Sequence, residues 1–559
     1  MNRRLISFGW LAIALAILLG EPIVTTAQIQ VTSANPSAAP QGSTNLNVTI
    51  TGNGFKKGAK AQWFVTGTTN PGGVTVNSTA FNSSGQLTAN ITVATGAVIS
   101  GFDIVVINAD GRTGKGTDKF AVTAQGTPVG CYSSGTPSGA TLVTELNPVQ
   151  PNGAALIATL RLGNAIRVRP LDLNRDGVVD TLVTFVTSGA SSSSTPGTYV
   201  FLLNPVTGEM QATNPITGVA WQNPILLLSG VRATLAAAGD VNGDHIPDFA
   251  FAGGSSTPYL FVGSVDNATY YPTWTAYPIS PPASASVALG DVDGIGVDEI
   301  VFGGDGASKK SPPGAVFIYK YTSGAVKYVR EIQDPTGVLA TGFGNAIAVG
   351  NIDGGKGNDL VVGAPSASTN GLVYVFPYPA QQTTYFALTG PGPGLGRGLG
   401  IADVYRNGLL DLVVITGKQD DTTAQALVYA GYVNSSSTYT NQLLPAVGLG
   451  NGWGTPNIDV ADMATAGTIA VGAPNATQGS SCNSIQGGAG ALHLFTSPFG
   501  SSQYPSYVFE TPSLVGSSQF EFGYGVGIAP GYPFIIIGEH YRDVGKTSQA
   551  GQVYVYKLN

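Results

Sequence analysis

Short apolar runs alternate with turn residues along the whole chain. Many of these runs alternate apolar and polar positions with a period of two, which is typical of β-strands that bury one face. Clusters of Gly, Pro, Asn, Asp and Ser separate the runs. The 3.6-residue spacing of an amphipathic helix is absent from the chain. The pattern therefore predicts an all-β protein.

Residues 28–122 are predicted to form a separate β-sandwich. The alternating runs here are 46–50, 87–93, 102–107 and 120–122, and such runs spaced by turn residues indicate two packed antiparallel sheets. The passages VTITGNGF, INADGRTG and FAV resemble the immunoglobulin-like IPT/TIG domains of bacterial surface proteins. This resemblance covers about one hundred residues and implies no catalytic chemistry. Residues 123–139, rich in Gly, Ser, Thr and Pro, are expected to be a linker.

The remainder of the chain, residues 140–559, is repetitive. One set of apolar strands is predicted at 181–186, 249–253, 300–303, 360–363, 412–416, 468–472 and 534–538. A second set, rich in Tyr, Val and Phe, begins at Gly197, Pro258, Gly314, Gly371, Gln425, Gly490 and Gly551, with a mean period of about 59 residues. Seven units of about four strands each predict a seven-bladed β-propeller.

The C-terminal unit predicts how the ring closes. Six units have a further strand after the Tyr/Val-rich strand, whereas the chain stops at Asn559 before the seventh can form one. An open ring would leave an unpaired sheet edge. The β-prone run at 140–146, just before the first unit, is therefore predicted to supply the missing strand.

Two nine-residue loops, DLNRDGVVD and DVNGDHIPD, carry oxygen-bearing side chains at places one, three, five and nine. With the carbonyl of the seventh residue, such positions can converge on one Ca²⁺. The predicted ligands are Asp172, Asn174, Asp176, Val178 and Asp180 in loop one, and Asp240, Asn242, Asp244, Ile246 and Asp248 in loop two. Turn formation without metal is the alternative, but clustered carboxylates without a cation would repel one another. An EF-hand is excluded, because the twelfth residues fall inside predicted strands and are not Glu.

Three more loops keep part of this pattern. The candidate ligands are Asp291, Asp293 and Glu299 in loop three and Asn351, Asp353 and Asp359 in loop four. Loop five has Asp403, Asn407 and Asp411, but Tyr405 occupies the third place. Units six and seven have lost the loop. We therefore expect two structural calcium sites and at most five, and metal-free turns are the alternative in the weaker loops.

Glycine motifs accompany the loops. They are Phe343-Gly344 and Gly363-Ala364-Pro365 in the fourth unit, Leu395-Gly396 in the fifth, Gly472-Ala473-Pro474 in the sixth and Phe522-Gly523 in the seventh. Together with the loops and strands, they resemble the FG-GAP repeat of integrin-α-type β-propellers over residues 140–559. The resemblance implies a propeller scaffold, but a shared fold does not transfer a function.

Charge and the N-terminal residues restrict the location and the partners. Residues 1–27 have Arg3 and Arg4, an apolar stretch and a small-residue cleavage site, the pattern of a secretory signal peptide. An uncleaved anchor is the alternative, and no later run is long enough to span a membrane. The net charge of −7 without a Lys/Arg cluster argues against nucleic acid. We expect a secreted, periplasmic or cell-surface protein of bacterial type, with Cys131 and Cys482 either bridged or free.

Catalytic motifs are lacking in the sequence. The three histidines, His245, His493 and His540, have no Ser or Cys nearby in a nucleophile arrangement. Aromatic residues cluster at 270–277, where packing between blades and a sugar-binding platform are the two alternatives. We therefore expect a non-enzymatic binding or adhesion protein for an extracellular protein or glycan. The alternative is a polysaccharide-acting enzyme of the lyase type, or a lectin, on the same scaffold.

Overall fold

The computed structural model consists of strands and turns. It describes residues 29–43, 45–94, 96–98, 100–123, 137, 139–146, 161–189, 197–229, 232–253, 257–281, 285–304, 314–378, 384–417, 424–445, 458–464, 466–475, 490–499, 502–503, 505–511, 521–541 and 550–559. These residues form no helix, so none of them belongs to a helix that could cross a bilayer. The predicted signal peptide, most of the linker and both cysteines lie outside the described residues.

The chain forms two compact units that meet in sequence at Val122 and Thr123. Residues Ala38–Gln41 belong to the first unit by hydrogen bonding, because strand β2 pairs with β8. The strands of the first unit are β1 (Gln30–Asn35), β2 (Ala38–Pro40), β3 (Leu46–Asn53), β4 (Lys60–Val65), β5 (Val74–Ser83), β6 (Gln86–Val93), β7 (Ser100–Ile107) and β8 (Thr113–Thr123). They form two four-stranded sheets, in the orders β1-β3-β6-β5 and β2-β8-β7-β4.

Alternating burial explains the core of the first unit. In β6 the buried residues Leu87, Ala89, Ile91 and Val93 alternate with partly exposed ones, as the sequence pattern predicts. The Trp63 side chain is almost fully buried and meets a Phe120 ring edge to face, at 5.8 Å between centroids. This unit carries no cluster of three or more potential metal-ligating side chains among its described residues.

The second unit begins with β9 (Ala140–Leu146) and continues as seven sheets among the described residues. The strands of its first four sheets are β10 (Leu162–Leu171), β11 (Thr181–Ser188), β12 (Gly197–Leu203), β13 (Ile225–Ser229), β14 (Leu235–Gly239), β15 (Asp248–Ala252), β16 (Tyr259–Val265), β17 (Pro272–Pro278), β18 (Ser286–Gly290), β19 (Glu299–Gly304), β20 (Ala315–Thr322), β21 (Ala325–Gln333), β22 (Ile347–Gly350), β23 (Asp359–Ala364), β24 (Leu372–Phe376) and β25 (Phe386–Leu388).

The last three sheets follow the same order. Their strands are β26 (Gly398–Ala402), β27 (Asp411–Thr416), β28 (Gln425–Tyr429), β29 (Asn441–Leu443), β30 (Ile458–Asp462), β31 (Gly467–Ala473), β32 (Ala491–Thr496), β33 (Ser502–Gln503), β34 (Tyr507–Glu510), β35 (Phe522–Ile528), β36 (Phe534–Glu539) and β37 (Gln552–Leu558). Strand β33 joins the outer side of the fifth sheet, parallel to β29.

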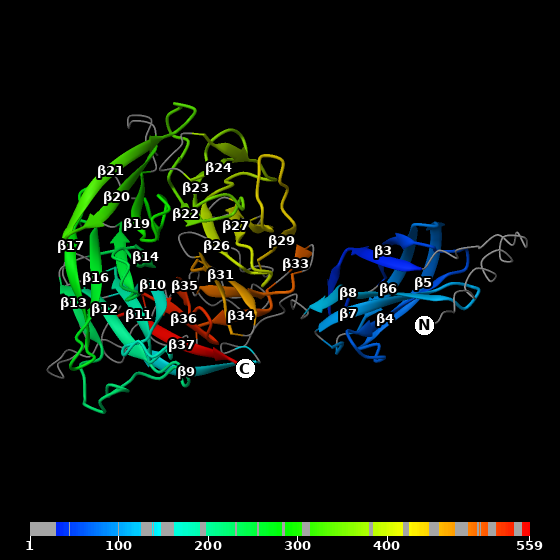
Figure 1. The fold of residues 1–559 in the computed structure, drawn as a ribbon, viewed down its shortest axis with the longest axis horizontal. Helices are drawn as coiled ribbons and strands as arrows, with labels where there is room; N and C mark the ends of the chain where they lie inside the picture. Colours follow the sequence, from blue (N-terminus) through cyan, green and yellow to red (C-terminus); the bar gives the residue numbers. More distant parts are fainter. Residues whose placement is uncertain are drawn as a thin grey trace, which may run out of the picture. The chain divides into compact units, whose positions relative to one another are not determined.

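The sheets of the second unit surround a common centre (Figure 1). The first strands of successive sheets are neighbours, from β10 through β14, β18, β22, β26 and β30 to β35, and β35 in turn lies beside β10. A small cavity of about 150 Å³ lies at this centre, lined by the start of each sheet. The arrangement is consistent with a β-propeller, in which each sheet is one blade.

Strand β9 supplies the outer strand of the last sheet. It pairs antiparallel with β37, with Leu146 opposite Val553 and Ala140 opposite Leu558. The prediction that residues 140–146 provide the strand that the C-terminal unit lacks is therefore confirmed. The pairing joins the N-terminal end of this unit to its C-terminal end and covers an edge that would otherwise be open.

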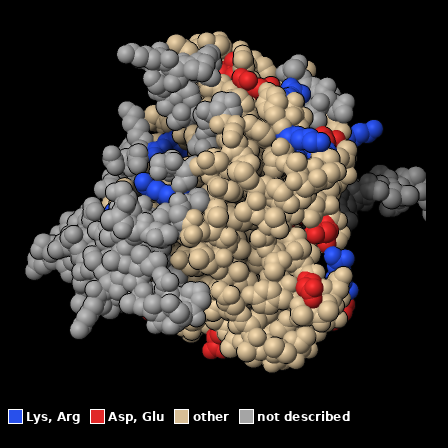
Figure 2. Space-filling view, turned by 90° about the vertical axis from the view of Figure 1, so that its left-hand side faces the viewer, with Lys and Arg blue, Asp and Glu red and all other residues tan. Residues whose placement is uncertain are grey.

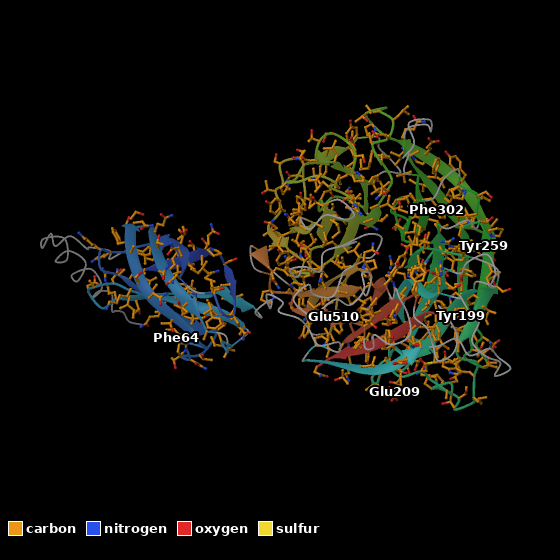
Figure 3. All side chains as sticks on the ribbon, turned by 180° about the vertical axis from the view of Figure 1, so that it is seen from behind. Phe64, Tyr199, Glu209, Tyr259, Phe302 and Glu510 are labelled. Carbon is orange, nitrogen blue, oxygen red and sulfur yellow. The ribbon has the colours of Figure 1, made fainter. Side chains whose placement is uncertain are left out.

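Glycines allow neighbouring sheets to approach closely. A Cβ added to Gly363 would overlap the carbonyl oxygen of Gly396 in the next sheet, and one added to Gly303 would overlap that of Gly344. Around these contacts, side chains fill the space between sheets, as Figure 3 shows near Phe302 and Tyr259. The recurring glycines of the sequence thus lie where one backbone crosses another.

The aromatic cluster at 270–277 is part of this packing. Tyr270 and Trp274 are partly buried against the core between the first two sheets. The Trp274 indole N–H donates to the Pro247 carbonyl at 2.9 Å, and Trp221 meets Tyr271 edge to face. Packing, rather than a sugar platform, accounts for these residues.

We expect Gly363→Ala to destabilise the second unit by about 1–3 kcal/mol, because the added methyl group forces two backbones apart. Differential scanning calorimetry would register this as a drop in Tm of several degrees. Gly390→Ala is the matched control, since its Cβ would meet only the Leu395 and Leu427 side chains. Equal effects of the two substitutions would contradict the role assigned to the glycine contact.

Candidate metal centre

The acidic loops connect the first strand of a sheet to the second. Loop one joins β10 to β11 and loop two joins β14 to β15, and loops three to five hold the corresponding places in the next three sheets. Because the first strands run side by side in the same direction around the centre, all five loops lie at the same end of their sheets. Hydrogen bonds from the loop backbone determine where each carboxylate points.

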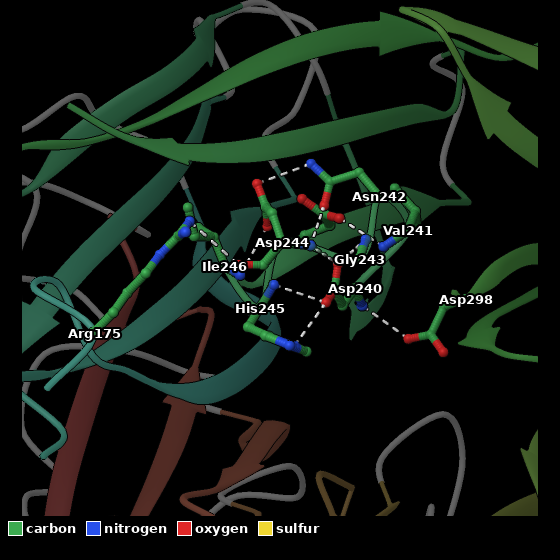
Figure 4. Close-up of polar contacts among 10 residues, drawn as sticks. Arg175, Asp240, Val241, Asn242, Gly243, Asp244, His245, Ile246 and Asp298 are labelled. Atoms are coloured by element: carbon green, nitrogen blue, oxygen red, sulfur yellow. Dashed lines mark hydrogen bonds and ion pairs between the residues drawn. The ribbon is translucent and has the colours of Figure 1, made fainter. Parts of the chain in front are cut away.

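Loop two is organised around the carboxylate of Asp240 (Figure 4). Its Oδ1 accepts N–H groups from Gly243 and Asp244 at 2.7 and 3.2 Å, and its Oδ2 accepts the His245 N–H at 2.9 Å. The Asp244 carboxylate accepts the Ile246 N–H at 2.9 Å. The His245 side chain is 94% exposed, with Nδ1 3.4 Å from Asp240 Oδ2. The loop backbone thus surrounds the Asp240 and Asp244 carboxylates and holds them in place through its N–H groups.

Loop one repeats this arrangement. The Asp172 carboxylate accepts the N–H groups of Asp176 and Gly177 at 3.2 and 2.7 Å. Asp176 Oδ1 accepts the Val178 N–H at 2.8 Å, and the Asn174 amide donates to Asp176 Oδ2 at 2.9 Å. The equivalent pair in loop two, Asn242 and Asp244, has the same contact at 3.0 Å. Identical spacing in sequence therefore produces the same local geometry twice.

The ninth-place carboxylate is buried in loops two to five and partly buried in loop one. Asp248 is fully buried, and its two oxygens accept the N–H groups of Val241 and Gly263, both at 2.7 Å. Burial raises the pKa of Asp248 to about 7, although the two N–H donors oppose the shift. In the other loops, the backbone N–H of the second residue likewise donates to the ninth-place carboxylate, at 2.8 to 3.0 Å. These carboxylates are Asp180, Glu299, Asp359 and Asp411.

Loop three is the place where carboxylates converge. Oxygens of Asp291, Asp293 and Glu299 lie within 4.8 Å of one another, close enough to hold one metal ion, and the described residues contain no second cluster of this kind. However, the Lys320 ammonium group on β20 already contacts Asp293 Oδ2 at 2.8 Å and Glu299 Oε1 at 3.2 Å. A side-chain cation therefore stands beside the carboxylates, and a metal ion would have to displace it.

Electrostatics in loop three reflect this pairing. Burial, together with the neighbouring Asp293 carboxylate, raises the pKa of Glu299 to about 7. Burial by itself would lower the pKa of Lys320, but its hydrogen bonds to Asp293 and Glu299 outweigh that effect and raise the pKa. Lys320 thus remains protonated at neutral pH and offsets part of the buried negative charge.

Loops four and five depart from the metal pattern in different ways. In loop four, the Asn351 amide donates to the Gly355 carbonyl at 3.0 Å, and the Gly355 N–H binds Asp353 at 2.6 Å. Burial raises the pKa of Asp359 to about 6. In loop five, the Tyr405 hydroxyl contacts Asn441, and its ring meets Phe499 edge to face. The third-place side chain of loop five therefore packs on neighbouring residues and offers no ligand.

The structure thus distributes the predicted ligands unevenly. The three carboxylates of loop one, and those of loop two, are arranged around one loop backbone but do not converge as closely as those of loop three. No Lys or Arg among the described residues forms an ion pair with Asp172, Asp176, Asp180, Asp240, Asp244 or Asp248. Among the described residues, loop three is therefore the acidic loop whose carboxylates pair with a Lys side chain, whereas the carboxylates of the two complete loops have no such cation.

Two residues of this region were not predicted from the sequence. Lys320 lies 21 residues after Glu299 and belongs to the loop only through the pairing of β19 with β20. Asp298 accepts the Asp240 N–H and donates its own N–H to the Asp240 carbonyl, both at 2.8 Å, so it links loops two and three. Loop three has Ile295 at the fifth place, where loops one and two have an Asp ligand. This difference in sequence was the available signal that the carboxylates of loop three are balanced by another group.

Comparisons with known proteins agree with this fold only weakly. No protein-family model matches the chain. A stretch of 149 residues is 26% identical to integrin alpha-4 of Xenopus laevis, covering 26% of this chain and 14% of that protein. The chain therefore matches a small part of that relative's length. This partial similarity is compatible with a propeller of the integrin-α type.

Two solved structures show low similarity. A humanized mutant of the Chaetomium thermophilum Polycomb Repressive Complex 2, bound to the inhibitor GSK126, gives a TM-score of 0.40 at 7% identity, over 76% of this chain and 98% of that chain. A DUF4784 family protein from Bacteroides caccae gives 0.25 at 10% identity, over 73% and 94% of the two chains. Neither similarity is close enough to bear on fold or function.

We expect Lys320→Met to give loop three a higher affinity for divalent cations, because it removes the ammonium group from Asp293 and Glu299. Equilibrium dialysis with Ca²⁺ should show one more bound ion per chain than in the wild type. The control is Lys327→Met, which removes a charge from the exposed cross-strand neighbour of Lys320. An unchanged stoichiometry in folded Lys320→Met protein would contradict the assignment.

The pKa of Asp248 predicts a pH dependence for the metal-free protein. Because the folded-state pKa is raised to about 7, the folded state holds a proton that the unfolded state releases above about pH 4. The stabilising contribution is present below about pH 4 and is lost as pH rises through about 7. With chelator present, the Tm of the wild type should fall as pH rises from about 4 to about 7, and Asp248→Asn should reduce this fall. Parallel profiles for variant and wild type would refute this.

Proposed function

We propose that the second unit is a seven-bladed β-propeller of the FG-GAP type, with calcium bound in loops one and two. In this proposal the first unit is an immunoglobulin-like domain, and the whole protein is exported. It acts as a non-enzymatic binding or adhesion module for an extracellular protein or glycan. The observation that carries the calcium assignment is the group of six loop carboxylates that no described Lys or Arg neutralises.

The charge balance of the loops supports calcium. Each complete loop brings together three carboxylates, of which the ninth-place one is buried in loop two and partly buried in loop one. A buried negative charge without a cation is strongly unfavourable. Ca²⁺ accepts six to eight oxygen ligands with loose geometry, which suits ligands spaced along one loop. Loop three supports the same reasoning, because it lacks the fifth-place ligand and has a side-chain cation, Lys320, beside its carboxylates.

Calcium in these loops would stabilise the scaffold. Each loop joins the first two strands of a blade, so an ion that binds its side chains holds the inner edge of that blade in place. Binding to the folded state alone contributes about 2.7 kcal/mol per site when the free ion concentration is 100 times the Kd. The binding partner would then be held elsewhere on the blades, on loops that the metal does not occupy.

The surface chemistry suits a partner without strong charge. On the face shown in Figure 2, the described charged side chains are few, include both signs and are separated by broad uncharged areas. Nucleic-acid binding needs clustered Lys and Arg, so nucleic acid is not proposed as a partner. A non-enzymatic role is proposed because His493 is buried within β32 and His245 is exposed beside Asp240.

We expect chelation of calcium to lower the Tm of the wild-type protein by several degrees, and re-addition of Ca²⁺ to restore it. Asp172→Asn and Asp240→Asn should each remove about half of this calcium-dependent shift. The matched control is Asp266→Asn, because Asp266 only closes an exposed turn with Ala268 and Thr269. An identical melting curve in excess chelator and in Ca²⁺ would refute structural calcium.

A glycan array, followed by incubation of each bound glycan with the protein, tests the binding role. Binding without a change in the glycan is the expected result. The appearance of unsaturated sugar products would show a lyase and would contradict the non-enzymatic assignment.

A further inference from the structure

An aromatic pocket lies between the second and third sheets, on their outer strands. Its cavity measures about 440 Å³, a size that is typical of small-molecule sites. Two segments line it, namely the end of β17 with the residues that follow it, and the hairpin of β20 and β21. The lining residues that matter here are Phe317, Tyr319, Tyr328 and Glu331 of the hairpin, with Ile279 and Ser280 of the second sheet. None of the predicted metal ligands belongs to this pocket.

A β-bulge turns Tyr328 and Glu331 to the same face of β21. Residues three apart on a regular strand point to opposite faces. Here Phe317 lies opposite Glu331 and Tyr319 lies opposite Tyr328, because β21 carries one extra residue, Val329, between these two pairs. Strand β21 has nine residues, whereas the fourth strands of the other six described sheets have three to seven. The long hairpin thus presents an aromatic ring and a carboxylate on one face.

Packing fixes one tyrosine of the pocket and leaves the other open. Tyr319 is 7% exposed and meets Phe302 and Tyr328 edge to face, at 5.9 and 5.6 Å between ring centroids. Tyr328 is 56% exposed, so much of its ring is accessible to a ligand. A side chain that its neighbours already hold loses little freedom when a ligand packs on it, which favours binding.

Two polar groups of the pocket have capacity for a ligand. The Glu331 carboxylate accepts the Gln333 side-chain amide at 3.2 Å and forms no ion pair with a described Lys or Arg. A carboxylate has about four acceptor positions, so most of them remain. The Tyr319 hydroxyl donates to the Ser280 carbonyl at 3.5 Å, which is longer than an ordinary O–H···O hydrogen bond. This hydroxyl can therefore turn toward a ligand.

These groups favour a ligand with an apolar face, hydroxyl donors and no negative charge. An aromatic ring binds apolar surface, and an ionised carboxylate only accepts hydrogen bonds. The same carboxylate repels a second negative charge. A neutral sugar meets all three conditions, because its ring has C–H groups on its faces and hydroxyl groups around its edge.

We propose that this pocket binds one neutral sugar residue of a glycan, with a face of the sugar ring on Tyr328 and hydroxyl groups donating to Glu331. The Tyr319 hydroxyl would supply a further hydrogen bond from the wall of the pocket. The inference rests on the proposed binding function and specifies the ligand class and the place where it binds.

Saturation-transfer NMR of the full chain with the methyl glycosides of glucose, galactose, mannose and xylose tests the proposal. Isothermal titration calorimetry then gives the Kd of each sugar that binds, with glucuronate as the charged comparison. We expect at least one neutral glycoside to bind more tightly than glucuronate. Tyr328→Ala should weaken its binding by about tenfold, because an aromatic anchor is lost. Glu331→Gln should weaken it as well, and should strengthen the binding of glucuronate by removing the repulsion.

The matched control is Tyr432→Ala. The Tyr432 side chain is exposed to a similar extent, at 59%, but it follows β28 in the fifth sheet and does not line the pocket. This variant should bind the neutral glycoside as the wild type does. Circular dichroism establishes that each variant is folded.

Several outcomes would overturn the proposal. Folded wild-type protein that binds none of the four glycosides, or Tyr328→Ala protein that binds them equally well, would exclude the pocket as a sugar site. Glucuronate binding as tight as that of the neutral sugar would exclude the assigned ligand class. Dimerisation that Tyr328→Ala abolishes would show that a second copy of the chain fills the pocket. Glycans that bind on the array and are retained by Tyr328→Ala would refute only this site and leave the binding function intact.

Discussion

The second unit depends on how closely the backbones of neighbouring sheets can approach. Sheets that surround a common centre are nearest to one another on the side facing that centre, and at some points there the backbones leave no room for a side chain. At Gly363 and Gly396, as at Gly303 and Gly344, a Cβ on one glycine would overlap the carbonyl oxygen of the other. Side chains fill the wider space farther from the centre, and the closing pair of β9 and β37 completes the ring with ordinary strand hydrogen bonds.

The acidic loops show two solutions to one electrostatic problem. Each loop buries its ninth-place carboxylate fully or, in loop one, partly, and this carboxylate accepts a backbone N–H group that holds the turn closed. Burial of that charge is unfavourable unless a cation balances it. In loop three Lys320 provides the cation from the third strand, whereas the six carboxylates of loops one and two have no described Lys or Arg partner. Calcium would fill the same role in those loops from solution.

The two ends of the sheets thus have different chemistry. The acidic loops lie within single hairpins and serve to hold strands together. The opposite end collects residues from separate sheets, such as Arg161 and His540, into one pocket.

Local spacing along the chain was enough to predict the elements that it encodes. Period-two runs and turn residues were sufficient to predict the strands, the separate first unit and the closing role of residues 140–146. Nine-residue spacing was sufficient to identify the loops, because their hydrogen bonds join neighbours in sequence. Only the tertiary structure placed Lys320 in loop three, linked Asp298 to Asp240 and brought Arg161 beside Tyr541. These contacts depend on strand pairing and on closure of the ring, which join residues whose separation in sequence carries no periodic signal.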